Sequence, residues 1–113
     1  MSTTDVGTVK LFENDKVVLW DFVLQPGEAT PCHTHAYDYV WYVIEGATLE
    51  VFDAQDRFLH SFEAPTGAVF TLRLEGDDLV RTDDASHRVP ATHWARNVGT
   101  TPYREILVET KRL

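Results

Sequence analysis

The stretch Pro31–His35, with the sequence PCHTH, is the most informative part of this chain because it places two histidines two residues apart. A proline–glycine turn precedes it, and the strand-like run Tyr39–Ile44 follows it. Side chains alternate between the two faces of a β-strand, so His33 and His35 project the same way, roughly 6–7 Å apart along the strand. Two neutral imidazoles held in this way can converge on one metal ion. The stretch therefore predicts half of a metal site.

A third histidine supplies the other half. His93 lies in a second strand-like run, where it shares one face with Ala95 and Asn97. The small side chain of Ala95 would leave room for a cavity above a bound ion. A single histidine is more often a hydrogen-bonded structural residue than a ligand, but the pair after the turn together with His93 favours metal binding. We predict His33, His35 and His93 as the metal ligands.

Composition describes an ordinary globular chain. Its 113 residues are enough for one domain with a single core. Hydrophobic residues make up 43% of the chain and charged residues 25%, which argues against disorder.

Charge and cysteine content indicate which binding partners and which cellular compartment to expect. Eighteen acidic and ten basic residues give a net charge of −8, which argues against nucleic acid or an anionic membrane surface as a partner. The start, Met1–Asp5, lacks the features of a signal peptide, and no apolar run approaches the ~20 residues of a membrane span. The single cysteine, Cys32, cannot form an internal disulfide. We expect a cytoplasmic domain.

Short β-strands are predicted almost throughout. Six Phe, four Tyr and three Trp join many Val and Thr residues, and turn signals recur at short intervals. This pattern is typical of a β-sandwich or small barrel. The predicted strands are Val6–Phe12, Lys16–Leu24, Ala29–His35, Tyr39–Ile44, Thr48–Phe52, Phe58–Glu63, Ala68–Leu74, Leu79–Thr82, Thr92–Val98 and Tyr103–Glu109.

Two segments resemble the motifs of the cupin superfamily. Gly27, His33-Thr34-His35, Tyr39 and Gly46 match the spacing of the first motif, glycine–x5–His–x–His–x3–Glu–x6–glycine, except that Tyr39 replaces the glutamate. His93 and Asn97 resemble the histidine–x3–asparagine end of the second motif, although Arg88-Val89-Pro90 replaces the proline–x–glycine before it.

The resemblance implies an all-β fold, a double-stranded β-helix of the jelly-roll or cupin-barrel type. It implies that residues 1–113 form a single cupin domain with a metal inside the mouth of the barrel. Small cupins are commonly homodimers, so a homodimer is expected.

The tyrosine in place of the glutamate shapes the predicted chemistry. Without the carboxylate, three neutral imidazoles leave the charge of a divalent metal uncompensated, which favours a small anionic substrate or ligand. The ion can be Fe(II), Ni, Zn or Mn. Tyr39 can ligate as a phenolate or act as a hydrogen-bonding or acid–base group, and we predict it as the catalytic residue. Asp38 is expected to face solvent, and Glu45 lies too far along the strand to replace the ligand.

Three functions remain open at this point. Resemblance to three-histidine cupins implies an iron(II) dioxygenase of the thiol- or diketone-cleaving type, with the histidines serving only as ligands. A Zn-, Ni- or Mn-dependent lyase or isomerase of a small acid or sugar derivative is the second reading. A non-catalytic module that binds a small molecule or metal is the third, because fold does not choose among these functions.

Other conspicuous side chains receive structural interpretations. His60 has no motif partner, and His87 lies in a polar segment that is better read as a solvated loop than as a pocket lid. Arg73 and Arg104 are expected to face outward and pair with acids. The remaining aromatic residues are mostly packing groups, although Trp41 and Phe22 can line an apolar pocket, and Cys32 is a small, partly buried thiol.

Overall fold

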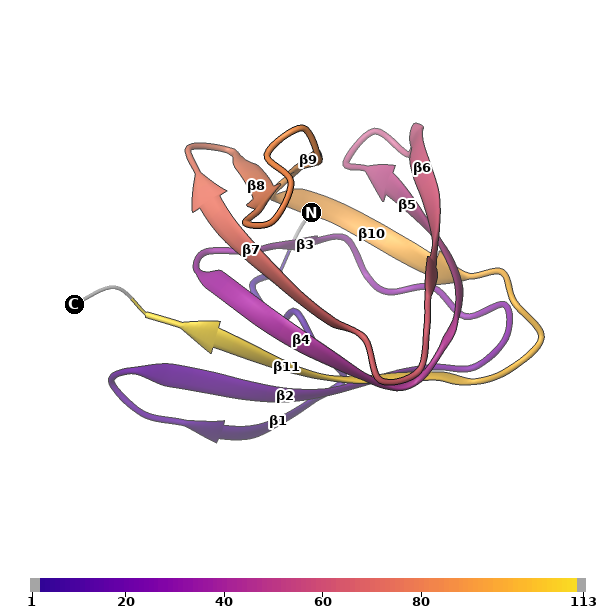
Figure 1. The fold of residues 1–113 in the computed structure, drawn as a ribbon, viewed down its shortest axis with the longest axis horizontal. Helices are drawn as coiled ribbons and strands as arrows, with labels where there is room; N and C mark the ends of the chain where they lie inside the picture. The colour runs from indigo at the N-terminus through magenta and orange to yellow at the C-terminus, as the bar shows by residue number, and fades with distance from the viewer. Residues whose placement is uncertain (1–2, 112–113) are drawn as a thin grey trace.

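The chain folds into two antiparallel β-sheets that face each other (Figure 1). The computed structural model describes residues 3–111. The predicted domain, residues 1–113, also includes residues 1–2 and 112–113, which lie outside the described part. Among residues 3–111, no helix has the length and apolar character needed to cross a membrane.

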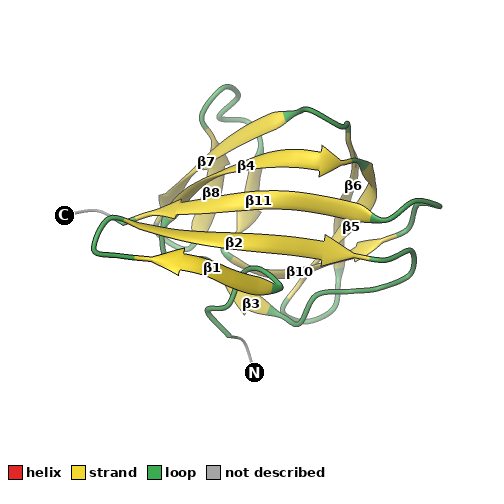
Figure 2. Ribbon diagram, turned by 90° about the horizontal axis from the view of Figure 1, so that it is seen from below, coloured by secondary structure: helices red, strands yellow, loops and turns green. Residues whose placement is uncertain are grey.

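The larger sheet has seven strands in the order β1-β2-β11-β4-β7-β8-β9. Figure 2 shows β1, β2, β11, β4 and β7 side by side. Its strands are β1 (Val9–Glu13), β2 (Val17–Leu24), β4 (Asp38–Glu45), β7 (Val69–Glu75), β8 (Asp78–Arg81), β9 (Arg88–Pro90) and β11 (Tyr103–Thr110).

The smaller sheet has four strands in the order β3-β10-β5-β6. Strand β10 lies at its centre, next to β3, which carries the first two histidines. The strands are β3 (His33–Thr34), β5 (Ala47–Asp53), β6 (Phe58–Ala64) and β10 (Thr92–Asn97). The predicted all-β, double-stranded β-helix fold is therefore confirmed.

Alternating burial shows that β2 and β11 each turn one face toward the core. In β2 every second residue is buried, and in β11 the buried residues are Tyr103, Glu105, Leu107 and Glu109. Period-two burial is what a strand needs when one face covers a core. Two glutamates occupy inward positions of β11, which the sequence reasoning did not anticipate.

Two differences from the predicted strands have clear backbone causes. The predicted strand Ala29–His35 is reduced to His33–Thr34, because Pro31 has no N–H to donate to a ladder; Ala29 instead makes an isolated bridge to Arg96. Strand β9 was not predicted, because it lies in a segment that was read as a loop. It pairs with β8 and forms the edge of the larger sheet.

The two glycines of the first motif have separate structural roles. Gly27 adopts a φ of 87°, a left-handed conformation that glycine takes without strain. A Cβ on Gly46 would lie 2.2 Å from the carbonyl oxygen of Ala64, so a side chain does not fit there. The spacing between these glycines therefore reflects a turn and a close backbone approach, not ligand binding.

Candidate metal centre

His33 and His93 come together through the pairing of β3 with β10. They are directly opposite each other in this antiparallel ladder, a position in which side chains on one face touch. Their ring centroids lie 4.8 Å apart. The structure therefore places the predicted third ligand beside the first.

His35 completes the cluster from just beyond the end of β3. Its backbone N–H donates to the carbonyl of Ala91, 2.9 Å away, which ties this segment to the residue before β10. Its ring centroid lies 5.0 Å from that of His33 and 5.0 Å from that of His93. One ring nitrogen from each of the three buried histidines lies within 4.8 Å of the others.

Backbone carbonyls fix the tautomers of two of these rings. Nδ1 of His33 donates to the carbonyl of Pro31 at 2.9 Å, and Nδ1 of His93 donates to that of Pro90 at 2.7 Å. A carbonyl can only accept, so Nδ1 carries the proton and the lone pair of Nε2 is left for a ligand. Metal-binding histidines are generally oriented in this way by their second nitrogen.

The electrostatic environment keeps the three rings neutral. Burial lowers the pKa of His33, lowers that of His35 well below the usual 6.5, and lowers that of His93 to about 4. The neighbouring histidines lower the pKa values of His35 and His93 further. Neutral imidazole is the form that binds metal, so the cluster suits a divalent ion at neutral pH.

An unsatisfied nitrogen supports the fit of a metal ion. Nδ1 of His35 is buried and has no hydrogen-bond partner among residues 3–111. Buried polar atoms nearly always have a partner, so such an exception in a histidine cluster calls for an explanation. A metal ion ligated by this Nδ1 would account for it. The cluster is therefore a candidate metal site, and its donor atoms do not identify the metal.

No carboxylate joins this cluster within the described part of the chain. Asp38 is only half-buried and accepts a hydrogen bond from the backbone N–H of Leu74 at 2.8 Å, so it does not simply face solvent as expected. Glu45 lies exposed at the end of β4. The structure brings the three predicted histidines together without a nearby carboxylate, and their role as ligands stays a prediction.

Tyr39 lies against the cluster. Its ring stacks on that of His35, with centroids 4.4 Å apart and planes 15° from parallel. Burial raises its pKa well above the usual 10.0, and the carboxyls of Glu105 and Glu109 add to this effect. The phenol therefore stays neutral near pH 7, which favours a packing or hydrogen-bonding role over ligation as a phenolate. A catalytic role for Tyr39 stays a prediction.

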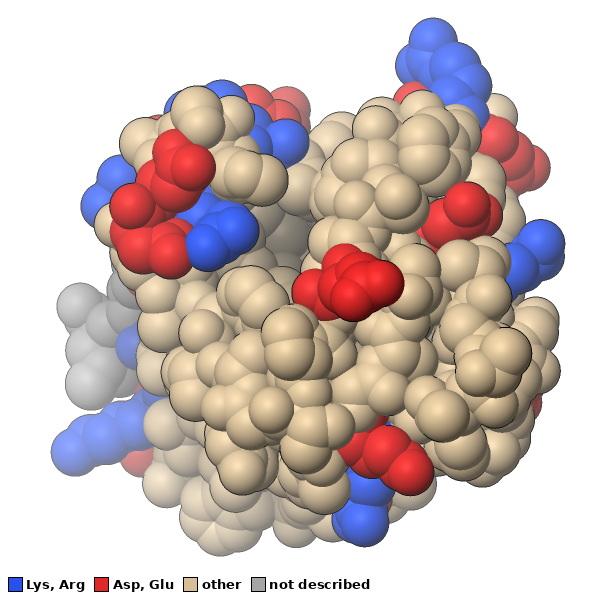
Figure 3. All heavy atoms as spheres, turned by 45° about the vertical axis from the view of Figure 1, so that its right-hand side comes forward, with Lys and Arg blue, Asp and Glu red and all other residues tan. Residues whose placement is uncertain are grey.

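The cluster opens into a cavity of about 510 Å³, a size that suits a small-molecule ligand. Trp41 and Phe22 line it, as the sequence reasoning allowed. His60 and His87 also line it, but neither belongs to the histidine cluster, and His87 is exposed in the segment between β8 and β9, where a solvated loop was expected. Figure 3 shows charged side chains of both signs gathered at the upper left of the face, beside a hollow in the surface.

Glu105 of β11 is one of the cavity residues that the sequence reasoning missed. It is 5% exposed, lines the cavity, and accepts a hydrogen bond from the Tyr103 hydroxyl at 2.6 Å. Its inward position follows from sharing strand parity with Tyr103 and Leu107. Little in the sequence indicates which face is inward, because Ile106 and Val108 on one face are as apolar as Tyr103 and Leu107 on the other.

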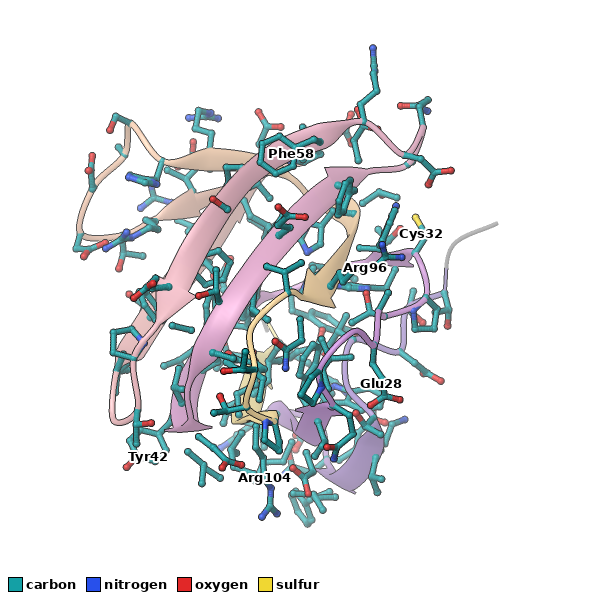
Figure 4. The ribbon with its side chains drawn as sticks, turned by 90° about the vertical axis from the view of Figure 1, so that its right-hand side faces the viewer. Glu28, Cys32, Tyr42, Phe58, Arg96 and Arg104 are labelled. Atoms are coloured by element: carbon teal, nitrogen blue, oxygen red, sulfur yellow. The ribbon has the colours of Figure 1, made fainter. Side chains whose placement is uncertain are left out.

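Other singled-out residues have structural roles. Arg73 pairs with Glu75, and Arg104 pairs with Asp21; both arginines are exposed, as predicted. Figure 4 shows the sulfur of Cys32 and the side chain of Arg104 pointing away from the sheets.

Asn97, the last residue of the second motif, is fully buried and binds backbone instead of a ligand. Its Nδ2 donates to the carbonyls of Leu24 and Thr101, at 3.0 and 2.8 Å, and its Oδ1 accepts from the N–H of Gly99 at 2.9 Å. These bonds fix the loop that leads into β11.

Comparisons with solved structures support the fold. The chain is similar to a cupin domain from Bordetella pertussis, with a TM-score of 0.68 and 17% identity over 99% of this chain and 98% of that one. It is also similar to a double-stranded β-helix protein from Klebsiella pneumoniae, with a TM-score of 0.57 and 15% identity over 94% and 78% of the two chains.

A third solved structure, the polyketide cyclase RemF from Streptomyces resistomycificus, has a TM-score of 0.54 and 20% identity, over 89% of this chain and 61% of RemF. No family model matches the sequence, and no curated protein matches it significantly. At these identities the likeness concerns the fold. The two facing sheets and the near-complete overlap with a cupin domain lead to one conclusion: this protein has the cupin fold.

Proposed function

We propose that the protein is a metal-dependent cupin enzyme that acts on a small anionic substrate, and that its first candidate activity is that of a three-histidine Fe(II) dioxygenase. One observation carries the proposal: among residues 3–111, the three buried imidazoles have no carboxylate in their group. Three neutral ligands leave the charge of a divalent ion uncompensated, so an anionic chelating group completes the site favourably.

The protein's own residues contribute binding and water exclusion. His33, His35 and His93 would hold the ion, and a bound Fe(II) would supply redox chemistry and open coordination positions. Tyr39 and Trp41 form an apolar wall beside the cluster, with ring centroids 5.7 Å apart. This wall would keep bulk water from the ligand-binding positions, which strengthens the electrostatic attraction of an anion.

Metal content and oxygen consumption test this activity. Elemental analysis of protein purified without added metal should find iron, and Fe(II)-loaded protein should take up O₂ in a substrate-dependent way when supplied with thiol acids and β-diketones. Tightly bound Zn or Ni with no O₂ uptake would exclude the dioxygenase. That result would leave a lyase, an isomerase or a non-catalytic binding protein.

A lyase, isomerase or cyclase is the second candidate, because of a buried carboxyl group in the cavity. Glu105 lines the same cavity as the histidines, and burial raises its pKa to about 8. A carboxyl group with a pKa near the working pH is suited to general acid–base catalysis. The similarity in fold to the polyketide cyclase RemF is compatible with this candidate. Conversion of an enolisable substrate by zinc-loaded protein without O₂ consumption would favour it.

We also propose a cytoplasmic homodimer. Strand β1 is an exposed edge strand, and Val9, Leu11 and Phe12 are each more than half exposed. An exposed apolar edge strand is a surface that a second copy can cover. Light scattering should give twice the monomer mass, and Leu11→Arg should return the protein to monomer. A monomeric wild-type protein would refute the dimer.

A further inference from the structure

The cavity has two chemically different ends. The three-histidine cluster lies at one end; the exposed residues Ser86 and His87, between β8 and β9, also line the cavity. The other end is lined by buried residues, among them Phe22, Leu49 and Glu105. The metal site uses only the first end, so the polar group at the buried end has no role yet.

Strand register gives the separation of the two ends. In β11, Glu105 pairs with Val43 of β4, whereas Tyr39, which stacks on His35, pairs with Glu109. Four residues separate Tyr39 from Val43, a distance of roughly 13 Å along a strand. Glu105 is therefore too far along the sheet to join the metal ligands, yet it faces the same cavity.

Aromatic rings cover the wall between the two ends. Trp41 packs against Phe70, with centroids 4.8 Å apart, and against Phe62, with centroids 6.5 Å apart. All three rings line the cavity. Such a wall favours a flat, apolar ligand body, because aromatic faces bury large areas at defined geometry.

Glu105 is held in place but is incompletely bonded. The Tyr103 hydroxyl donates to its Oε1, and no ion pair to Glu105 forms among residues 3–111. Its Oε2 has no hydrogen-bond partner within the same residues. A buried carboxyl group with hydrogen-bonding capacity left unused is costly to keep, so a structural role alone explains it poorly.

We propose that Glu105, positioned by Tyr103, is a specificity residue that hydrogen-bonds a hydroxyl or carbonyl oxygen at the far end of a planar aromatic ligand. The anionic group of the same ligand would lie at the histidine end, and that half of the proposal rests on the proposed function. Burial raises the pKa of Glu105 to about 8, so the carboxyl group is mainly protonated at neutral pH. A protonated carboxyl group both donates and accepts, which suits a neutral oxygen and not a second anion.

The test compares two probes that differ by one hydroxyl group, 6-hydroxy-2-naphthoate and 2-naphthoate. Calorimetry with zinc-loaded wild-type protein at pH 6.5 should show the hydroxylated probe binding about tenfold more tightly. Glu105→Leu should bring the affinity ratio to about one, and Glu105→Gln should keep most of it, because an amide also donates and accepts. Tyr103→Phe should reduce the ratio by loosening the carboxyl group.

Controls separate this proposal from folding defects and from the proposed function. Glu109→Gln alters the other buried glutamate of β11, which bonds Trp20 outside the cavity lining, and should leave the ratio unchanged. Thermal unfolding of each variant checks that it is folded. His93→Ala should lower the affinity for both probes by the same factor. If it changes neither affinity, the proposed function is wrong, but the ratio of the two affinities still tests the role of Glu105. Wild-type protein that binds neither probe or lacks the preference would overturn the inference, as would a folded Glu105→Leu that keeps it.

Discussion

His33 and His93 face each other directly across the β3–β10 ladder, although they come from opposite halves of the chain. This cross-strand pair fixes two ligand nitrogens on rigid backbone, and each ring is oriented by a carbonyl two or three residues before it. A site built on paired strands is held more precisely than one built on loops. The candidate metal site is therefore part of the sheet structure itself.

The first prediction concerns the ligands. His93→Ala should weaken metal affinity by about 100-fold or more, because loss of a direct ligand should exceed the 10–100-fold effect typical of an outer-shell change. Titration with Zn(II) in a competing chelator measures it. His87→Ala, which alters an exposed cavity histidine outside the cluster, is the matched control. A His93→Ala protein that keeps stoichiometric, equally tight metal would show that the third ligand is wrong.

Substitutions of Tyr39 separate packing from chemistry. Tyr39→Phe keeps the ring that stacks on His35, so metal affinity should change by less than about threefold. Tyr39→Ala removes a buried ring and should lower the free energy of unfolding by about 3–5 kcal/mol. Urea denaturation and metal titration measure the two effects. If Tyr39→Phe loses metal as completely as His93→Ala, the phenol is a ligand after all.

Glu105 should make stability fall as pH rises. Its pKa is about 8 in the folded protein, so its contribution is fully present below its unfolded pKa near 4.5 and is lost between pH 4.5 and 8. The loss amounts to as much as about 5 kcal/mol by the linkage relation. The titratable groups facing Glu105 are Tyr103 and Tyr39, whose pKa values are raised, so both stay neutral in this window.

Urea denaturation of metal-free protein at several pH values measures this dependence. Glu105→Gln cannot ionise and should show a smaller loss of stability from pH 5 to pH 8 than the wild type. Glu109→Gln is the matched comparison, since burial also raises the pKa of Glu109, but the hydrogen bond from Trp20 and the nearby charges of Lys10 and Lys111 oppose that rise. Identical slopes for wild type and Glu105→Gln would mean that Glu105 ionises normally.

Asn97 should contribute to stability and not to metal binding. Asn97→Ala would leave two carbonyls and one N–H without their partner, which predicts a loss of about 2–4 kcal/mol. Arg104→Ala removes an exposed ion pair with Asp21 and should cost less than about 1 kcal/mol. Chemical denaturation compares the two variants. A metal affinity that collapses in a folded Asn97→Ala protein would instead place Asn97 in the site.

The sequence by itself determined most of the fold and the three ligand candidates. Alternating apolar residues and frequent turns predicted the strands, and the His33–His35 spacing predicted two side chains on one face. These properties are local, because a strand imposes a period of two on its own residues. The motif spacing also identified Gly27 and Gly46. Gly27 lies in a turn with a positive φ, and the backbone of Gly46 lies close to that of Ala64.

Only the tertiary structure decided which strands meet and which face of β11 is inside. No local pattern sets His33 opposite His93, because that pairing depends on the register between distant strands. Likewise, Glu105 and Ile106 are neighbours in an apolar run, and only the pairing of β11 between β2 and β4 in the folded sheet places the glutamate in the cavity. The PCHTH stretch thus predicted two of the three donors, whereas the shape and polarity of the cavity around them came from long-range strand pairing.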